Sequence, residues 1–253
     1  MAASLTPQEV WLFRHNGFII PPGKLPDDLL DRVNAVTDRQ VAEQIEPIVW
    51  KYDISDPGRR IVNPLSKILD RDAAYLEAAT HPVVLDALEA LIGPNIELLT
   101  NKHNMMMIKP GNAPPVEWHR GEALHQPPLL TVSIAFGDAT MENGCLRIVP
   151  GSHVDPSNVD EYMVGGSWRR GMDFHKVEFF RHSVPVPVGR GQVLIFHDSV
   201  YHGSDANHTS DDRRALTFGY TAHATHDVRK DDPERKLVRG ERAYRGHPVP
   251  GAD

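Results

Sequence analysis

The chain has 253 residues, of which 40% are hydrophobic and 24% charged, and its formal net charge is −7. This length suits a single domain with a substantial core. The negative charge argues against binding a nucleic acid polymer through the overall field. There is no apolar run long enough to span a bilayer, no signal-peptide pattern at residues 1–4, and no cysteine besides Cys145. We therefore expect a cytoplasmic protein with no membrane contact and no intrachain disulfide.

Helical signals dominate the first third of the chain. Residues 6–9 combine an N-cap threonine, a proline at the first helical position and a capping-box glutamate. This pattern predicts a helix that ends at Gly17. Residues 18–20 then form a short predicted strand. Apolar residues at helical spacing predict a second helix from residue 26 and a third over 82–92.

Candidate strands dominate the rest of the chain. They cover residues 96–109, 129–136, 145–149, 192–196 and 215–220. We expect one domain of a mainly β class with flanking α-helices. Residues 1–95 would form a helical buttress and the first strands, residues 96–222 a strand-rich core, and residues 223–253 a charge-rich, loosely packed arm. The long polar and aromatic segment 154–184 is typical of a lid or binding loop.

The order of three residues along the chain suggests a metal site. His119 comes first, His202 follows, and Arg213 lies further along the chain. Two imidazoles with one carboxylate and open positions suit a non-haem Fe(II) oxygenase, because O₂ and a chelating cosubstrate need the remaining positions. The arginine supplies a fixed fork for a distal carboxylate. Two residues after His119, where the third ligand is expected, stands Gly121.

Several short motifs, taken in order, carry a resemblance to the phytanoyl-CoA dioxygenase family over roughly residues 101–220. They are Asn101-Lys102, Ile108-Lys109-Pro110-Gly111, Trp118-His119, Glu142-Asn143-Gly144-Cys145-Leu146-Arg147, Val149-Pro150-Gly151-Ser152-His153, Phe196-His197, His202-Gly203-Ser204 and Arg213. The resemblance implies a double-stranded β-helix (jelly roll, cupin-like). It also implies His119 and His202 as iron ligands, with Fe(II), 2-oxoglutarate and O₂ as cofactors. Arg213 would bind the C5 carboxylate of 2-oxoglutarate with help from Ser204.

Gly121 departs from the family pattern, which normally has an aspartate at this position. The chain resembles the halogenase branch, in which glycine or alanine leaves room for chloride beside the iron. The resemblance therefore implies an iron- and 2-oxoglutarate-dependent halogenase. Its expected reaction is chlorination of an unactivated C–H bond of a free small molecule in natural-product biosynthesis.

The strand after the first ligand has one face of small side chains. Alternation places Thr131, Ser133 and Ala135 on one face and larger apolar residues on the other. If the small face lines the site, Ser133 would lie with Gly121 at the halide, and Thr131 would contact the cofactor. The alternative is a strand with one face exposed to water.

Other interpretations of the site remain open from the sequence. A true His-X-Asp pattern occurs at 153–155 and would form a different triad with His202. Glu122 would supply the missing carboxylate if a turn or bulge reversed its direction. Either a natural hydroxylase or one engineered at Gly121 is one alternative to a halogenase. A non-catalytic metabolite-binding protein is the other.

The predicted lid suggests a substrate class. Trp168, Arg169 and Arg170 combine an aromatic ring with two cations, which suits stacking on a base and binding a phosphate. With His125, they are the candidate substrate residues, and they favour a nucleotide or other phosphorylated metabolite. The alternative is a loop whose arginines are solvated.

Overall fold

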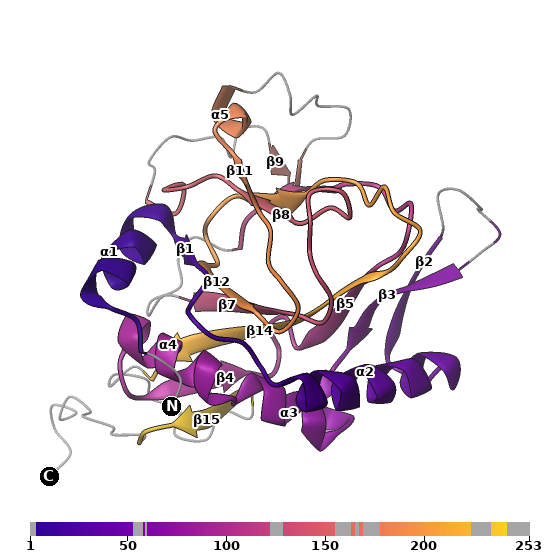
Figure 1. The fold of residues 1–253 in the computed structure, drawn as a ribbon, viewed down its shortest axis with the longest axis horizontal. Helices are drawn as coiled ribbons and strands as arrows, with labels where there is room; N and C mark the ends of the chain where they lie inside the picture. The colour runs from indigo at the N-terminus through magenta and orange to yellow at the C-terminus, as the bar shows by residue number, and fades with distance from the viewer. Residues whose placement is uncertain are drawn as a thin grey trace, which may run out of the picture.

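The structure is a computed structural model, and it describes residues 4–52, 58, 60–121, 129–154, 163–164, 167–168, 178–223 and 234–241. Across these ranges the strands form two antiparallel sheets that face each other, with the long helices beneath the larger one (Figure 1). This is the double-stranded β-helix, mainly β with flanking α-helices, that the sequence motifs imply.

The larger sheet has nine strands and carries most of the core. Its order is β1 (Phe18–Ile19), β12 (Val193–His197), β7 (Leu129–Ala135), β14 (Arg213–Ala222), β5 (Met105–Lys109), β3 (Arg60–Ser66) and β2 (Ile48–Tyr52), with β4 (Ile96–Leu99) beside β14 and β15 (Arg235–Arg239) beside β4. Residues on one face of β7 join the main hydrophobic cluster with α2 and α4. That face includes Leu130, Val132 and Ile134.

The smaller sheet has six strands and lies at the top of Figure 1. Its order is β11 (Val184–Val186), β8 (Leu146–Ile148), β13 (His202–Ser204), β6 (Val116–His119), β10 (Ser167–Trp168) and β9 (Met163–Val164). The two strands of segment 154–184, β9 and β10, therefore extend the sheet beyond β6. The space between the two sheets is where facing side chains meet.

The first helix, α1 (Pro7–Asn16), follows from its capping residues. Thr6 Oγ1 accepts a hydrogen bond from the Glu9 amide at 3.2 Å, and the Glu9 carboxylate accepts one from the Thr6 amide at 2.7 Å. Gly17 ends the helix in the left-handed region, with φ 80°. The predicted capping box and C-cap are confirmed.

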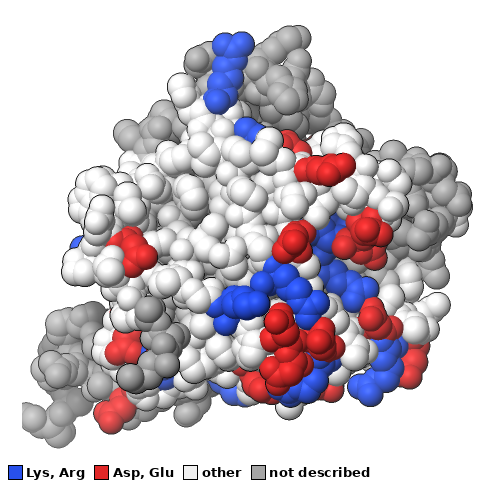
Figure 2. Space-filling view, in the orientation of Figure 1, with Lys and Arg blue, Asp and Glu red and all other residues white. Residues whose placement is uncertain are grey.

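Most of the other described helices buttress the larger sheet: α2 (Asp27–Ala42), η1 (Ile68–Asp70), α3 (Ala73–Ala79) and α4 (Pro82–Ile92). The short α5 (Glu178–Arg181) lies near the smaller sheet. Salt bridges connect α2 to the strands and turns beside it, from Asp31 to Arg190 at 2.5 Å and from Asp38 to Arg214 at 2.7 Å. Figure 2 shows the resulting interleaved charges at the lower right, over α2. Exposed pairs of this kind orient the helix more than they stabilise it.

Two expectations about the elements were wrong. The predicted strand 96–109 is two strands, because the chain turns between them with His103 and Asn104 at positive φ. Residues 235–239 form β15 against β4, rather than part of a loosely packed arm. The N-terminal strands β1, β2 and β3 join the same sheet as the strands after residue 96. Residues 1–95 and the strand-rich core of residues 96–222 therefore share one sheet. None of the described helices is both long and apolar enough to cross a bilayer.

Candidate active site

Two histidines from neighbouring strands of the smaller sheet face each other. His119 ends β6, and His202 begins β13, directly opposite it in the strand register. Their ring centroids are 4.2 Å apart, with an angle of 54° between the ring planes. The predicted pair of ligands is therefore brought together by strand pairing.

Each of these imidazoles is oriented by a backbone carbonyl. His119 Nδ1 lies 2.8 Å from the Glu117 carbonyl oxygen, and His202 Nδ1 lies 2.9 Å from that of Val200. A carbonyl only accepts, so each Nδ1–H donates and each Nε2 keeps its lone pair. Burial lowers the pKa of both rings, that of His202 to about 3. Neutral imidazoles with a free Nε2 are the form that binds a metal ion.

A buried guanidinium lies further inside the barrel. Arg213 begins β14, and burial lowers the pKa of its guanidinium. Its Nε is buried and has no hydrogen-bond partner. The side chain shares a cavity of about 10 Å³ with Ser133, Leu194 and Ala215. A buried cation with an unused donor fits an anionic ligand such as the distal carboxylate of 2-oxoglutarate.

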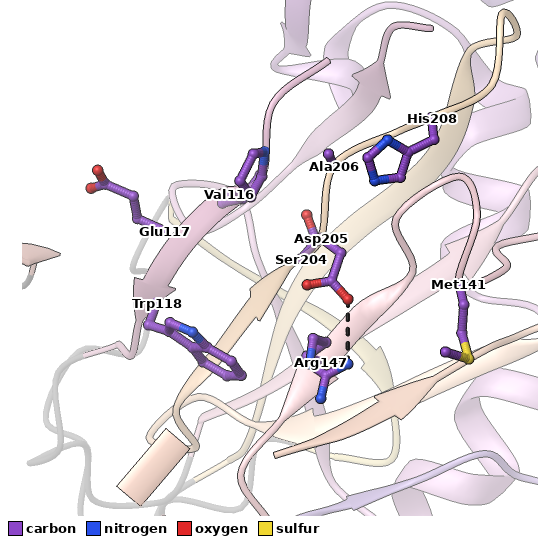
Figure 3. Close-up of a pocket in the computed structure, with 10 residues that line it drawn as sticks. Val116, Glu117, Trp118, Met141, Arg147, Ser204, Asp205, Ala206 and His208 are labelled. Atoms are coloured by element: carbon purple, nitrogen blue, oxygen red, sulfur yellow. Dashed lines mark hydrogen bonds and ion pairs between the residues drawn. The ribbon is translucent and has the colours of Figure 1, made fainter. Parts of the chain in front are cut away.

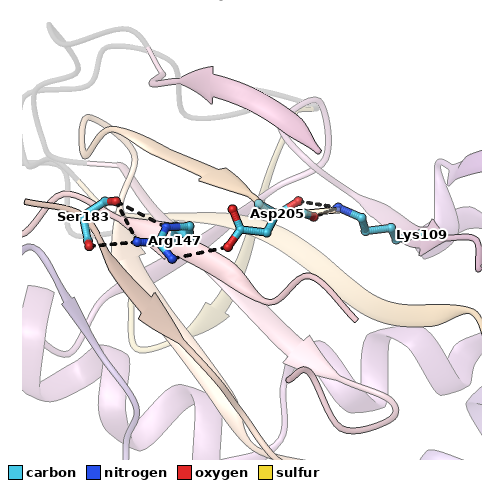
Figure 4. A network of polar contacts seen from close by, with 5 residues as sticks. Lys109, Arg147, Ser183 and Asp205 are labelled. Carbon is cyan, nitrogen blue, oxygen red and sulfur yellow. Dashed lines mark hydrogen bonds and ion pairs between the residues drawn. The ribbon is translucent and has the colours of Figure 1, made fainter. Parts of the chain in front are cut away.

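A second cation lies next to Arg213, and the sequence reasoning had not assigned it a role. Lys109 on β5 pairs with Arg213 in the strand register. Its Nζ donates to Ser204 Oγ at 2.8 Å and to the Asp205 carbonyl (Figure 4). Burial and the charge of Arg213 lower the pKa of the Lys109 ammonium to about 8. Ser204, which we expected beside Arg213, is thus in contact with this lysine.

Gly121 has no free space beside its Cα. A Cβ built on it would lie 1.7 Å from Asp198 Oδ2 and 2.1 Å from Asp198 Cγ. In addition, the Gly121 amide donates to the Asp198 carbonyl at 2.8 Å. The expectation that the missing side chain leaves a vacancy is therefore wrong in this structure, because the carboxylate of Asp198 takes up that space.

Asp198 is a site residue that sequence reasoning missed. It lies just after β12, and its carboxylate is almost fully buried. Its Oδ1 lies 3.5 Å from both His103 Nε2 and Thr131 Oγ1. Burial works against the charged form, but the hydrogen bond and charge of His103, together with the nearby His202 and Lys102, outweigh it and lower the pKa of the Asp198 carboxyl. The only local signal was a carboxylate four residues before a candidate ligand.

The small face of β7 connects the two ends of this site. Thr131 and Ser133 are both buried, so this face is not exposed to water. Thr131 Oγ1 lies 3.0 Å from His103 Nε2, near Asp198 and Gly121, whereas Ser133 lies beside Arg213.

The structure gives no support to the alternative iron ligands that the sequence offers. His153 packs against α1, where its Nε2 lies 3.1 Å from the Arg14 carbonyl oxygen and its ring packs on His197. Asp155 and Glu122 lie outside the described residues, as do three of the candidate substrate residues, His125, Arg169 and Arg170. Trp168 is described only through its strand: β10 pairs with β6, with Ser167 opposite His119.

A cavity of about 300 Å³ lies against the outer face of β6, the strand that ends at His119. Trp118 alternates with His119 on β6, so it points to the opposite face of the strand. There it lines the cavity together with Met141, Arg147 and His208 (Figure 3). Arg147 is bound there to Asp205 at 3.3 Å and to the Ser183 carbonyl at 3.1 Å. Arg147 therefore belongs to this outer cavity.

The donor set fits an iron ion and a dicarboxylate cosubstrate. His119 and His202 offer free Nε2 atoms, and Arg213 offers an unused buried donor. Within the described ranges, no group of three or more His, Cys, Asp or Glu side chains is arranged to hold a metal ion. Among the described residues, the imidazole pair therefore has no third protein ligand. A jelly roll with this site is that of a non-haem iron, 2-oxoglutarate-dependent oxygenase.

Comparison with known proteins identifies the family. Residues 13–215 match the phytanoyl-CoA dioxygenase (PhyH) family, and the chain belongs to it. It is thus an Fe(II)- and 2-oxoglutarate-dependent oxidoreductase that acts on a small molecule.

Relatives from different organisms share this family resemblance. The chain is 27% identical to dioxygenase lolE1 of Epichloe uncinata over 84% of its length and 80% of that protein. It is also 27% identical to peroxisomal phytanoyl-CoA dioxygenase of Mus musculus, over 84% of this chain and 67% of that one. Among solved structures, the epimerase SnoN in complex with Fe³⁺, alpha-ketoglutarate and nogalamycin RO has a TM-score of 0.69 at 21% identity. The match covers 85% of this chain and 83% of that one. That likeness confirms the fold.

Replacing His202 by alanine should abolish iron binding. Outer partners of ligands already contribute about 10- to 100-fold to metal affinity, so we expect at least about a 100-fold loss of Fe(II) affinity here. The measurement is the rise in Tm on adding Fe(II) without O₂, since a ligand that binds only the folded state raises its stability. Wild type and the exposed-histidine variant His182→Ala should both show this rise. A normal rise in His202→Ala would exclude His202 as a ligand.

Proposed function

We propose that this protein is an Fe(II)/2-oxoglutarate-dependent halogenase that chlorinates an unactivated C–H bond of a free small molecule. The observation that carries the proposal is the pair His119 and His202 with Gly121 in place of the third ligand. When bound, iron, 2-oxoglutarate and O₂ supply the oxidant that removes a substrate hydrogen. An anion held nearby then decides which atom replaces it. Chloride is the anion that a glycine at this position favours.

The protein groups have separate roles in this proposal. His119 and His202 hold the metal through Nε2, with their rings oriented by backbone carbonyls. Arg213 binds the distal carboxylate of 2-oxoglutarate, and Lys109 and Ser204 add a charge and a hydroxyl beside it. Thr131 and Ser133 place hydroxyl groups along the wall between the two ends. In this proposal chloride is a cosubstrate in addition to Fe(II), 2-oxoglutarate and O₂.

A hydroxylase is the second candidate, and the position of Asp198 favours it. The Asp198 carboxylate covers the Cα of Gly121, where a halide is expected to bind. An anion of the protein in that place would leave hydroxylation as the outcome.

The substrate is proposed to be a nucleotide or another phosphorylated metabolite. Trp168 lies in β10, which pairs with β6, the strand of His119. This pairing supports a position for the segment around Trp168 near the substrate. We therefore retain Trp168, Arg169, Arg170 and His125 as candidate substrate residues. Natural-product biosynthesis is supported by the fold shared with SnoN, an enzyme from nogalamycin biosynthesis.

Chloride should change the absorption of the protein loaded anaerobically with Fe(II) and 2-oxoglutarate. We expect a shift of its visible metal-to-ligand band on titration with chloride. Under O₂, mass spectrometry should detect a chlorinated product, or a brominated one in bromide. An unshifted band together with a product that only gains a hydroxyl would contradict halogenation. Oxygen-18 labelling of that hydroxyl would then establish the hydroxylase.

A further inference from the structure

The carboxylate of Asp198 lies where the proposed halogenase needs space for chloride. We propose that Asp198 determines the halide affinity of this enzyme, because its side chain competes with an external halide for the space beside Gly121. The inference rests on the proposed function and deepens it, since it names the residue that sets halide affinity. The contact that carries it is the 1.7 Å between Asp198 Oδ2 and a Cβ built on Gly121.

The backbone of Asp198 is fixed, so only its side chain is free to move. Its amide donates to the Leu129 carbonyl at 2.9 Å, and its carbonyl accepts from the Gly121 amide at 2.8 Å. These two bonds hold the Cα of Asp198 against the residues on both sides of segment 122–128. Rotation of the side chain is therefore the movement that uncovers the Cα of Gly121.

The side chain itself is held only weakly. Its partners among the described residues, His103 Nε2 and Thr131 Oγ1, both lie at 3.5 Å from Oδ1, which is long for a hydrogen bond. The carboxylate is 7% exposed, so water screens its charge poorly. His103 has a 29% exposed side chain, and its Nε2 lies near Oδ1 of the carboxylate, whereas Oδ2 is the atom nearest a Cβ built on Gly121. Turning toward His103 would give the carboxylate a closer partner and would open the space.

Competition follows from volume and charge together. A halide and the Asp198 carboxylate are both anions and would claim the same space. Repulsion between like charges at contact distance in a buried site is worth several kcal/mol before relaxation. Asp198→Asn keeps the shape and removes the charge, whereas Asp198→Ala removes both. We therefore expect chloride affinity to rise in the order wild type, Asp198→Asn, Asp198→Ala.

The experiment measures chloride and iron binding separately. The full chain, loaded with Fe(II) and 2-oxoglutarate without O₂, is titrated with sodium chloride at constant ionic strength, and the visible band is followed. Fe(II) affinity is measured by competition with a chelator. Glu43→Gln is the matched control, because it removes one negative charge at the exposed end of α2. Thermal melting checks the fold of each variant.

We expect Asp198→Asn to bind chloride about tenfold or more tightly than wild type, a change of about 1.4 kcal/mol. Its Fe(II) affinity, and both affinities of Glu43→Gln, should match wild type. A band shift in the Asp198 variants but not in wild type would also support competition, and would make wild type a hydroxylase.

Three results would overturn the inference. If wild type and Asp198→Asn bind chloride equally, Asp198 does not compete, and the halogenase proposal still stands. If Asp198→Asn loses Fe(II) affinity, the carboxylate belongs to the iron-binding set instead. If chloride shifts the band in no variant although 2-oxoglutarate binds, both proposals fail.

Discussion

Gly121→Asp is expected to destabilise the protein, although it restores the residue that the family normally has at this position. A Cβ at position 121 meets the Asp198 carboxylate, so any side chain there forces Asp198 to move. Because the Asp198 side chain is able to turn away, we expect an overpacking cost at the lower end of about 1–3 kcal/mol, to which a second carboxylate in the same buried space adds repulsion. For a chain of this length, each kcal/mol lowers Tm by about 2–4 °C. We expect Gly121→Ala to show the smaller fall and Gly121→Asp the larger.

The reason for the loss can be isolated with matched variants. Gly137→Ala is the control, because nothing lies within 4 Å of a Cβ built there. It should leave Tm unchanged or slightly raised. The double variant Gly121→Ala/Asp198→Ala should recover most of the stability lost in Gly121→Ala, with a coupling energy of about 1 kcal/mol or more. Additive effects of the two changes would show that Asp198 is not the obstacle.

A second double variant tests the chemistry at the same position. In Gly121→Asp/Asp198→Ala, the carboxylate is moved from the end of β12 back to the family's usual place, with room for its side chain. We expect this variant to bind Fe(II) at least as tightly as wild type and to yield no chlorinated product. A chlorinated product from it would mean that the halide does not bind beside Gly121.

Arg213→Met is expected to abolish tight binding of 2-oxoglutarate without destabilising the fold. The Nε of Arg213 is buried and without a partner, and burial lowers the pKa of its guanidinium. Replacing a poorly compensated buried charge by an apolar side chain is often neutral or stabilising by about 1–4 kcal/mol. Loss of charge-assisted hydrogen bonds of about 1.5–3 kcal/mol should raise the Kd for 2-oxoglutarate about 10- to 100-fold.

Its neighbour provides the control. Arg214 points to the other face of β14, where it pairs with Asp38 at 2.7 Å. Arg214→Met should leave the Kd for 2-oxoglutarate unchanged and lower stability by no more than about 1 kcal/mol. The Kd is measured by anaerobic titration of the Fe(II) protein, and stability by thermal melting. Equal effects of the two substitutions on the Kd would remove Arg213 from the cosubstrate site.

Local signals predicted the three longest helices, α1, α2 and α4, because capping and apolar spacing are short-range effects, whereas the shorter α3 was not predicted. The Thr6 and Glu9 capping box and the Gly17 C-cap set the limits of α1. Pro82 and Gly93 do the same for α4. In contrast, β2 and β15 are edge strands and β3 lies next to an edge, where pairing partners, rather than alternation along the chain, decide the structure.

The candidate site likewise contains some residues that local motifs predict and others that only contacts across the fold reveal. His119, His202 and Arg213 stand in recognisable motifs, so their order in the chain was enough to predict them. Asp198 became visible only when the end of β12 was placed against Gly121, a contact between residues far apart in the chain. Lys109 gained a role through its register with Arg213. Pairing across strands, which no single segment encodes, accounts for both omissions.

The backbone bonds of Asp198 also have an evolutionary consequence. One residue ties down both sides of segment 122–128, at Gly121 and at Leu129. Because the attachment uses backbone atoms, it does not depend on the side chain at position 198. Substitutions of Asp198 can therefore change the charge beside Gly121 without displacing His119 or β7. Position 198 is a natural place for selection, or a directed library, to change the anion beside Gly121 while the strands of His119 and His202 stay as they are.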